Sequence, residues 1–407
     1  MFDSSSIIVG LEIGTSKICA VVGDMNDDGA LNIIGIGQAP SRGVRKGEIV
    51  DAAAAEECIR EAIVQAETMA DVEIRSVYLG VTGGHIRGFT NHGVHPVVSS
   101  DREITQDDVD DVVKNAKSVN LPAENSILHA IRQHFIVDGQ TGVTNPVDML
   151  GARLEVDVHV VHGNTNRISN AVRAVKGMQL EVEAVVYNGL AASLAVLTNE
   201  QKETGALVID FGGGTTDYVV YMDGIIKHTG TLAVGGDHVS NDLAFGLKVP
   251  LGRAESLKIE HGTAIVDETV RGLEINFKSA SSGFERSVSR EHLQLIMAAR
   301  IEEIFELIAQ DIESAGLLNY LGSGVFLCGG GARIPRVAEL ATETFGLPVS
   351  LGRTNCISGI KAALDHPEFA TAIGLVRFGS FQQRKPRSGN PLTETVKSTL
   401  PSLFRRS

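Results

Sequence analysis

The sequence has no tryptophan, and aromatic residues make up only 5% of its 407 residues. Proteins that bind single-stranded nucleic acid stack bases on exposed aromatic rings, so this composition argues against that class of function. No apolar run approaches the roughly 18 residues that a membrane-spanning helix needs, and we expect no such helix. The first residues, MFDSSSIIVGLEIG, include an acid and no basic segment, which does not fit a secretory signal peptide.

The signatures of several enzyme and metal-binding classes are also missing. The sequence contains no GxxxxGK[ST] phosphate loop, no GxGxxG followed by a ribose-binding acid, and no convincing catalytic triad. Four cysteines without CxxC spacing are expected to be buried thiols in a reducing compartment: Cys19, Cys58, Cys328 and Cys356. No histidine spacing indicates a metal, and four histidines are interpreted as solvent-facing strand positions: His129, His134, His159 and His162.

Basic charge is scarce over most of the chain. The formal net charge is −14, and a body of that charge repels the phosphates of nucleic acid. Residues 380–407 are the exception, because six basic residues stand there against one acid, which gives +5 and leaves −19 for the rest. We therefore expect no nucleic-acid partner, while the C-terminal segment favours a negatively charged surface.

A pattern of acid and glycine occurs twice along the chain. Around Glu12, and again around Asp210, an apolar run is followed by an acid, a glycine, hydroxyl residues and a second apolar run. We predict two β-hairpins with tight turns at their tips. Glycines allow backbone amides to form a concave nest for phosphate oxygens. Two such tips facing each other across a cleft would hold a polyphosphate from both sides.

The side chains near these turns fit the same interpretation. Four hydroxyls can donate further hydrogen bonds to phosphate: Thr15, Ser16, Thr215 and Thr216. A carboxylate beside each loop would repel phosphate unless a hard cation lay between them. We therefore expect Mg²⁺, held through water by Glu12 and Asp210.

A third glycine run, residues 329–331, follows a predicted strand and precedes a predicted helix from about Pro335 to Phe345. Its backbone would give a flat surface on which a nucleotide base can lie. Glu255 and Lys258 supply an acid and a base one helical turn apart, which suits ribose hydroxyls and a ring face. The same spacing also occurs in ordinary solvated pairs on a helix. Apolar periodicity predicts further helices over residues 51–70 and 291–315.

Together these motifs resemble the actin–sugar kinase–chaperone ATPase superfamily and, within it, the FtsA family of bacterial cell-division proteins. The resemblance covers nearly the whole chain. It is carried by the stretches VGLEIGTSK (9–17), ITQDDVDDVVKNAKSVN (104–120), NPVDMLGARLEVDVHVV (145–161), LAASLAVLTNEQKETGALVIDFGGGTTDYVVY (190–221), GTLAVGGDHVSNDLAFGL (230–247), AESLKIEHG (254–262), GGGARIPRVAELA (329–341) and PEFATAIGLVRFG (367–379).

The resemblance implies an α/β, actin-like fold in which two halves surround a nucleotide cleft, with the extra subdomain typical of FtsA. The expected parts are a first core subdomain (1–84 plus 362–380), the inserted subdomain (85–163), a second core subdomain (164–250 plus 306–361), a small nucleotide-cleft and partner-binding subdomain (251–305), a linker (381–391) and an amphipathic membrane-targeting segment (392–407).

ATP with Mg²⁺ is the ligand that the resemblance implies. The first phosphate loop would be Gly14, Thr15, Ser16 and Lys17, with Glu12 near the metal. The second would be Asp210, Gly212, Gly213, Gly214, Thr215 and Thr216. Ribose and base would lie near Gly235, Gly236, Glu255 and Lys258, and the adenine on Gly329, Gly330, Gly331 and Ala332. Asn188 is the candidate for orienting the attacking water, but an amide is a poor base, so we expect at most weak ATPase activity.

The implied function is a protein that polymerises at midcell on the cytoplasmic face of the inner membrane, bound peripherally, and anchors filaments of the tubulin-like protein FtsZ during septum formation. Its partners would be the acidic C-terminal tail of FtsZ, other copies of itself, anionic lipid and other division proteins. Arg300 matches a family arginine that grips the FtsZ tail.

The C-terminal segment fits membrane binding by its own pattern. On a helical wheel, five apolar residues share an arc of about 120°: Leu392, Val396, Leu400, Leu403 and Phe404. Lys397, Arg405 and Arg406 add cations that attract anionic lipid. A solvated chain end is the alternative, and Pro401 would kink a continuous helix. One such segment binds weakly, so we expect polymerisation to add avidity.

Two other functions remain open at this point. A metabolite kinase of the same superfamily would need a catalytic aspartate over the γ-phosphate and a polar sugar pocket, neither of which we find. A pilus-assembly adaptor with a similar arrangement of subdomains would lack the amphipathic segment.

Overall fold

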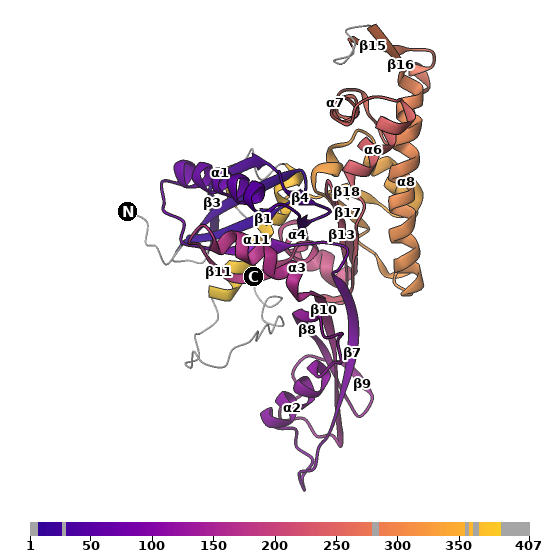
Figure 1. The fold of residues 1–407 in the computed structure, drawn as a ribbon. Helices are drawn as coiled ribbons and strands as arrows, with labels where there is room; N and C mark the ends of the chain where they lie inside the picture. The colour runs from indigo at the N-terminus through magenta and orange to yellow at the C-terminus, as the bar shows by residue number, and fades with distance from the viewer. Residues whose placement is uncertain (1–6, 27–29, 279–284, 355–357, 361–365, 384–407) are drawn as a thin grey trace.

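The computed structural model describes residues 7–26, 30–278, 285–354, 358–360 and 366–383. The predicted membrane segment 392–407, with all of its apolar and basic residues, lies outside the described residues, as do Cys356 and most of the predicted linker. The described chain contains two mixed sheets, a separate four-stranded sheet, two short two-stranded sheets and the helices around them (Figure 1).

The first sheet has the strand order β11-β6-β1-β2-β3-β19. Its strands are β1 (Ile7–Ile13), β2 (Lys17–Met25), β3 (Leu31–Pro40), β6 (Ser76–Val81), β11 (Glu181–Tyr187) and β19 (Ser358–Gly359). Helix α1 (Ala52–Ala70) covers β3 and is capped, as predicted, by Asp51, whose carboxylate accepts a hydrogen bond from the Ala54 amide. A Cβ on Gly37 would lie 1.8 Å from the Ala62 carbonyl oxygen, so only glycine permits this close packing.

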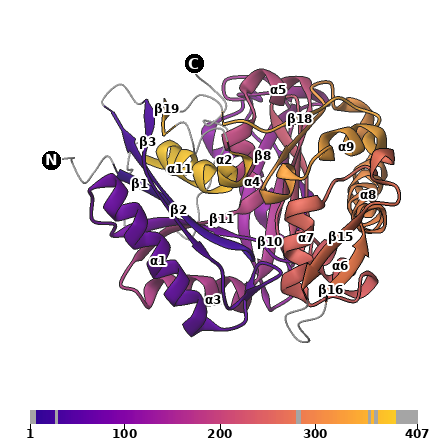
Figure 2. The same ribbon diagram turned by 90° about the horizontal axis from the view of Figure 1, so that it is seen from above.

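The second sheet has the order β14-β13-β12-β17-β18. Its strands are β12 (Ala206–Phe211), β13 (Thr216–Met222), β14 (Ile225–Leu232), β17 (Val325–Cys328) and β18 (Val349–Leu351). Helices α4 (Asn188–Val196) and α11 (Ala370–Gln383) lie between the two sheets, at the centre of Figure 2. Helix α4 packs on β12 and β13, and α11 packs on β1 and β2, so this helix pair joins the two halves.

The inserted four-stranded sheet has the order β7-β10-β8-β9 and its own hydrophobic cluster. Its elements are β7 (Arg87–Pro96), α2 (Gln106–Lys117), β8 (Asn125–Val137), β9 (Gln140–Val143) and β10 (Arg153–Asn164). It projects from one side of the molecule (Figure 1). The interpretation of the histidines as solvent-facing is wrong for His129 and His159, which are 2% and 1% exposed. Both lie where the core covers this sheet, and alternation along a strand cannot distinguish water from another part of the protein.

The remaining elements surround the second sheet or connect the parts. They are β4 (Val44–Arg45), β5 (Glu48–Ile49), α3 (Thr165–Lys176), α5 (Asn199–Thr204), α6 (Gly236–Gly246), α7 (Leu251–His261), β15 (Glu274–Lys278), β16 (Glu285–Ser289), α8 (Arg290–Ser314) and α9 (Val337–Phe345). Helix α8 matches the predicted helix 291–315 closely. Helix α9 begins two residues later than predicted, because Gly330–Arg333 form a 3₁₀ turn and Arg336 adopts a left-handed conformation with φ 62°.

Three further sequence predictions can be compared with the described residues. Cys19, Cys58 and Cys328 are buried free thiols, as expected. Among the helices of the described ranges, none is both long and apolar enough to cross a bilayer. The domain boundaries given above stay a prediction.

Candidate functional site

The first predicted hairpin is formed by β1 and β2, which pair antiparallel from Ile7 to Asp24. Its turn closes with a hydrogen bond from the Gly14 amide to the Lys17 carbonyl oxygen at 3.0 Å. A Cβ on Gly14 would lie 2.6 Å from that oxygen, so the turn requires glycine. The tip therefore presents backbone together with the short side chains of Thr15 and Ser16.

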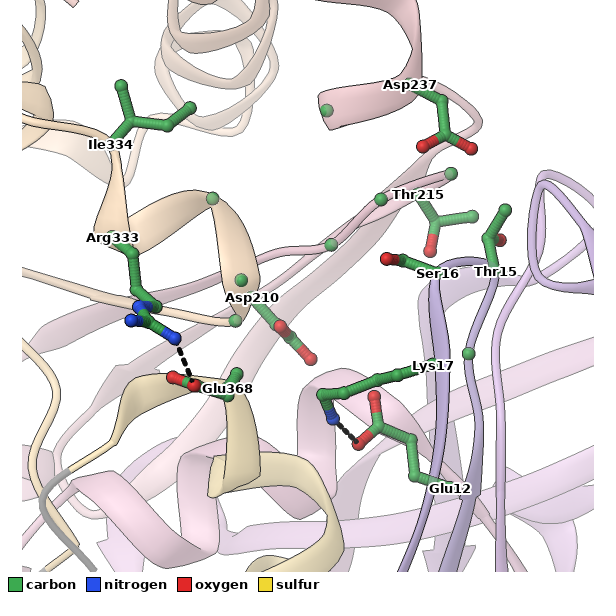
Figure 3. A pocket seen from close by; sticks show the side chains of 18 of the residues that line it. Glu12, Thr15, Ser16, Lys17, Asp210, Thr215, Asp237, Arg333, Ile334 and Glu368 are labelled. Carbon is green, nitrogen blue, oxygen red and sulfur yellow. Dashed lines mark hydrogen bonds and ion pairs between the residues drawn. The ribbon is translucent and has the colours of Figure 1, made fainter. Parts of the chain in front are cut away.

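The second hairpin, formed by β12 and β13, repeats the same turn. The Gly212 amide donates to the Thr215 carbonyl oxygen at 3.0 Å. The two tips face each other closely, because a Cβ on Gly213 would lie 3.0 Å from the Ser16 Cβ. Figure 3 shows Thr15 and Ser16 beside Thr215. Two glycine turns, one from each sheet, thus meet at one place.

A cavity of about 690 Å³ lies between these tips and the third glycine run. It brings together most of the predicted site residues. Its lining includes Glu12, Gly14, Thr15, Ser16, Lys17, Asn188, Asp210, Gly212, Gly213, Gly214, Thr215, Gly236, Glu255, Lys258, Gly329, Gly330 and Gly331.

Three predicted nucleotide-binding residues lie beside the cavity and are not part of its lining: Thr216, Gly235 and Ala332. The Thr216 hydroxyl donates to the Val234 carbonyl oxygen at 2.8 Å and is fully buried. Gly235 packs against the second turn, where a Cβ would lie 2.5 Å from the Gly212 carbonyl oxygen. Thr216 points away from the cavity because neighbouring residues of a strand point in opposite directions.

Charged groups of both signs lie at the base of the cavity. Lys17 Nζ lies 3.1 Å from a carboxylate oxygen of Glu12. Burial lowers the pKa of Lys17, but its acidic neighbours, Glu12 foremost and Asp210 among them, together raise it more, so the net pKa lies above the ordinary value. Burial, and then the charge of Glu12, raise the pKa of Asp210 to about 6. The Thr371 hydroxyl donates to Asp210 at 2.5 Å. Glu12 and Asp210 therefore lie close enough to repel each other.

A cation would relieve that repulsion, so these residues fit Mg²⁺. Among the residues that the structure describes, no group of three or more His, Cys, Asp or Glu is placed to hold a metal directly. Mg²⁺ usually keeps several waters and takes one or two carboxylates together with substrate phosphates. The arrangement of Glu12 and Asp210 matches that kind of site, with water between carboxylate and metal.

The acid and base on α7 form a pair that faces the cavity. Lys258 Nζ lies 2.7 Å from a Glu255 carboxylate oxygen and 3.1 Å from the Gly236 carbonyl oxygen. The Ser240 hydroxyl also donates to Glu255. The Lys258 side chain is 12% exposed and that of Glu255 43%, so water reaches the acid of this pair more than the base. Both residues are available to a ligand at this end of the cavity.

Asn188 is the first residue of α4 and is 3% exposed. Its side-chain oxygen has no hydrogen-bond partner within the described parts of the chain. Because a buried polar atom without a partner costs free energy, this oxygen is suited to accept a hydrogen bond from a ligand or a water in the cavity.

Several cavity residues were not predicted. Asp217 is 2% exposed and closes the DFGGGTTD motif, so its signal was present in the sequence. Burial raises the pKa of Asp217 to about 7. Thr82 comes from a distant segment without a recognisable motif. Glu368 lies in the stretch PEFATAIGLVRFG, and its carboxylate accepts a hydrogen bond from Arg333 at 2.7 Å (Figure 3). The remaining members of the lining are Gln38, Pro40, Asp237, Ile259, Ile334 and Pro335.

Arg300, the predicted partner-binding residue, lies on α8 and is not part of the cavity lining. Its guanidinium donates to Asp242 at 2.5 Å and to Glu303. These hydrogen bonds raise the pKa of Arg300 further. Its side chain is 29% exposed, so an acidic partner would have to displace or join these two carboxylates.

Two family models match parts of this chain. A family model described as "Cell division protein FtsA" matches residues 207–374, and one described as "SHS2 domain inserted in FTSA" matches residues 83–162. The cell division protein FtsA of Pseudomonas aeruginosa is 36% identical over 93% of this chain and 91% of its own length. That of Neisseria meningitidis is 39% identical over 90% and 88%.

Solved structures share the fold at low identity. The PilM–PilN type IV pilus biogenesis complex matches with a TM-score of 0.64 and 16% identity, over 93% of this chain and 99% of that one. MreB5 of Spiroplasma citri bound to ADP matches with a TM-score of 0.58 and 16% identity, over 95% and 100%. Identities this low show the fold alone. The two FtsA relatives share more than a third of their residues with this chain over nearly their whole length, and this similarity shows the family. The chain therefore belongs to the FtsA family of cell division proteins, with an actin-like fold and an inserted SHS2 domain.

Proposed function

We propose that this chain binds ATP with Mg²⁺ between its two halves, polymerises on the cytoplasmic face of the cell membrane at midcell, and anchors FtsZ filaments there. The observation that carries the nucleotide part is the meeting of two glycine-turn hairpins, one from each sheet, at a cavity of about 690 Å³. The solved MreB5 structure with the same fold is bound to ADP.

The backbone amides at the two tips would donate to phosphate oxygens, and the hydroxyls of Thr15 and Thr215 would add to them. Because the tips belong to different halves, a phosphate group held by both favours the arrangement in which the halves are close. ATP would thereby shift the population toward one conformation by differential binding. We propose that this conformation is the one that polymerises.

The carboxylates of Glu12 and Asp210 would hold Mg²⁺ through water, and Lys17 would balance their charge. A bound Mg²⁺ would neutralise phosphate charge. Asn188 would orient a water near the phosphates, but its amide cannot take a proton from that water. We therefore propose at most weak ATPase activity.

The partner and membrane parts of the proposal rest on other regions. Arg300 binds Asp242 on α6, and the exposed Phe245 lies three residues further along the same helix. An acidic peptide with apolar residues, such as the FtsZ tail, would find a cation and an apolar side chain there. The basic amphipathic segment 392–407 would bind anionic lipid. The relatives in the FtsA family argue against the two alternatives, a pilus-assembly adaptor and a metabolite kinase.

Binding of labelled ATP to wild type and to Asp210→Ala tests the nucleotide site. With Mg²⁺ present, we expect the variant to bind at least about tenfold more weakly, which corresponds to roughly 1.4 kcal/mol. Without Mg²⁺ the loss should vanish, because the removed carboxylate then only repelled phosphate. Asp110→Ala, which removes an exposed carboxylate on α2, serves as the control. Unchanged affinity of Asp210→Ala in Mg²⁺ would overturn the assigned role of this carboxylate.

A further inference from the structure

The inserted sheet is joined to the core by buried polar contacts. His159 on β10 lies 2.9 Å from the Thr229 hydroxyl on β14. The Gln133 side chain on β8 donates to the Ile226 carbonyl oxygen at 2.9 Å. Both contacts are made to β14, the edge strand of the second sheet, because Thr229 and Ile226 belong to that strand. The insert is therefore docked against an element of the core that continues directly into the cleft.

Tyr187 is the residue at which the insert and both halves of the core meet. It ends β11, the edge strand of the first sheet, and is fully buried. Its backbone amide donates to Nε2 of His129 in the insert at 3.0 Å. Its phenol donates to the Gly230 carbonyl oxygen on β14 at 2.5 Å. Burial lowers the pKa of His129 to about 4, so this imidazole is neutral near pH 7 and can accept that hydrogen bond.

Two short connections run from Tyr187 to the cavity. Asn188, the next residue, lines it with an unpartnered side-chain oxygen, as described above. The Tyr187 phenol donates to the Gly230 carbonyl oxygen, and Thr231, the next residue along β14, donates its hydroxyl proton to Asp217 at 2.7 Å. Asp217 lines the cavity and also accepts from the Thr82 hydroxyl of the first half at 2.8 Å.

We propose that Tyr187 is a positioning residue that couples the state of the nucleotide cleft to the docking of the inserted SHS2 domain. The side chains in this chain of contacts are buried, and Gly230 is half-buried, so a lost hydrogen bond would leave a polar atom that water reaches poorly without its partner. If β14 or the start of α4 moves, Tyr187 has to move with it to keep its hydrogen bonds, and the contact with His129 in the insert changes as well. Such coupling is reciprocal, so a partner that binds the insert would change nucleotide affinity.

Hydrogen–deuterium exchange of the full chain, with and without ATP and Mg²⁺, tests this coupling, which rests on the proposed nucleotide function. In wild type we expect slower exchange with nucleotide in two places: the phosphate loops, residues 9–17 and 207–216, and the insert junction, residues 125–137 and 225–232. In Tyr187→Phe the loops should still respond, whereas the junction should lose its response. The expected change at the junction is about fivefold or more, the lower end of ordinary allosteric couplings.

Tyr221→Phe is the matched control. Tyr221 is also fully buried, and its hydroxyl lies 2.8 Å from that of Ser193 within the core. This variant should behave like wild type. The coupling is overturned if Tyr187→Phe keeps the junction response, if Tyr221→Phe loses it as well, or if the wild-type junction does not respond while the loops do. An absent loop response in wild type would instead overturn the nucleotide function, and the coupling with it.

Discussion

At the level of single residues, buried carboxylates define the chemistry of the cleft. Burial raises the pKa of Asp210 to about 6 and that of Asp217 to about 7. Both groups are therefore held in places that disfavour their negative charge. A bound cation favours the charged form, so a metal–nucleotide complex would stabilise the folded protein through these residues as well as through its own contacts.

A buried histidine gives a prediction on the pH dependence of stability. The folded state holds the pKa of His129 at about 4, below its ordinary value of 6.5, because burial disfavours the imidazolium. The unfolded state therefore binds the proton first, and stability is lost as the pH falls from 6.5 toward 4. Between pH 7 and pH 5, the depressed pKa of this residue should lower the free energy of unfolding by about 2 kcal/mol.

Urea unfolding at a series of pH values measures the effect. His129→Gln keeps an acceptor for the Tyr187 amide but cannot be protonated, so its free energy of unfolding should fall less steeply over this range. His292→Gln, which changes an exposed histidine at the start of α8, should keep the wild-type slope. An equal slope for His129→Gln and wild type would mean that this imidazole is not neutral in the fold.

At the level of elements, local patterns predicted much of the structure and non-local contacts were missed. Both hairpins around Glu12 and Asp210 were predicted, because acid, glycine and apolar runs are adjacent in sequence. The capping of α1 by Asp51 is equally local. The burial of His129 and the place of Thr82 in the cavity depend on segments that are brought together only by folding. No periodicity within one segment contains that information.

The crossing of α4 and α11 supplies a prediction about an element. A Cβ on Gly374 would lie 1.8 Å from the backbone oxygen of Ala191, and backbone cannot move aside as a flexible side chain can. Gly374→Ala should therefore separate the helices that join the two halves and destabilise the protein by about 1–3 kcal/mol. Thermal unfolding measures the loss. Gly330→Ala, where no described atom lies within 4 Å of the added carbon, should leave the unfolding temperature nearly unchanged.

At the level of the whole molecule, charge is divided between an acidic body and a basic end. The body carries −19 and residues 380–407 carry +5. An anionic membrane surface attracts that end by roughly 1 kcal/mol for each lysine or arginine close to it, and it repels the body. This division would hold the protein at the surface by its tail with the body directed away from the lipid.

Sedimentation with vesicles measures this attachment. Full-length protein should pellet with vesicles that contain anionic lipid and much less with neutral ones, and added salt should weaken its binding. A chain truncated at Gln382 keeps the described core and should stay in the supernatant. Because one short segment binds weakly, ATP with Mg²⁺ should increase pelleting of the full-length chain if polymers present many tails at once. If the truncated and full-length chains pelleted equally, the tail would not be the membrane-binding segment. The membrane contact would then have to lie on the acidic body.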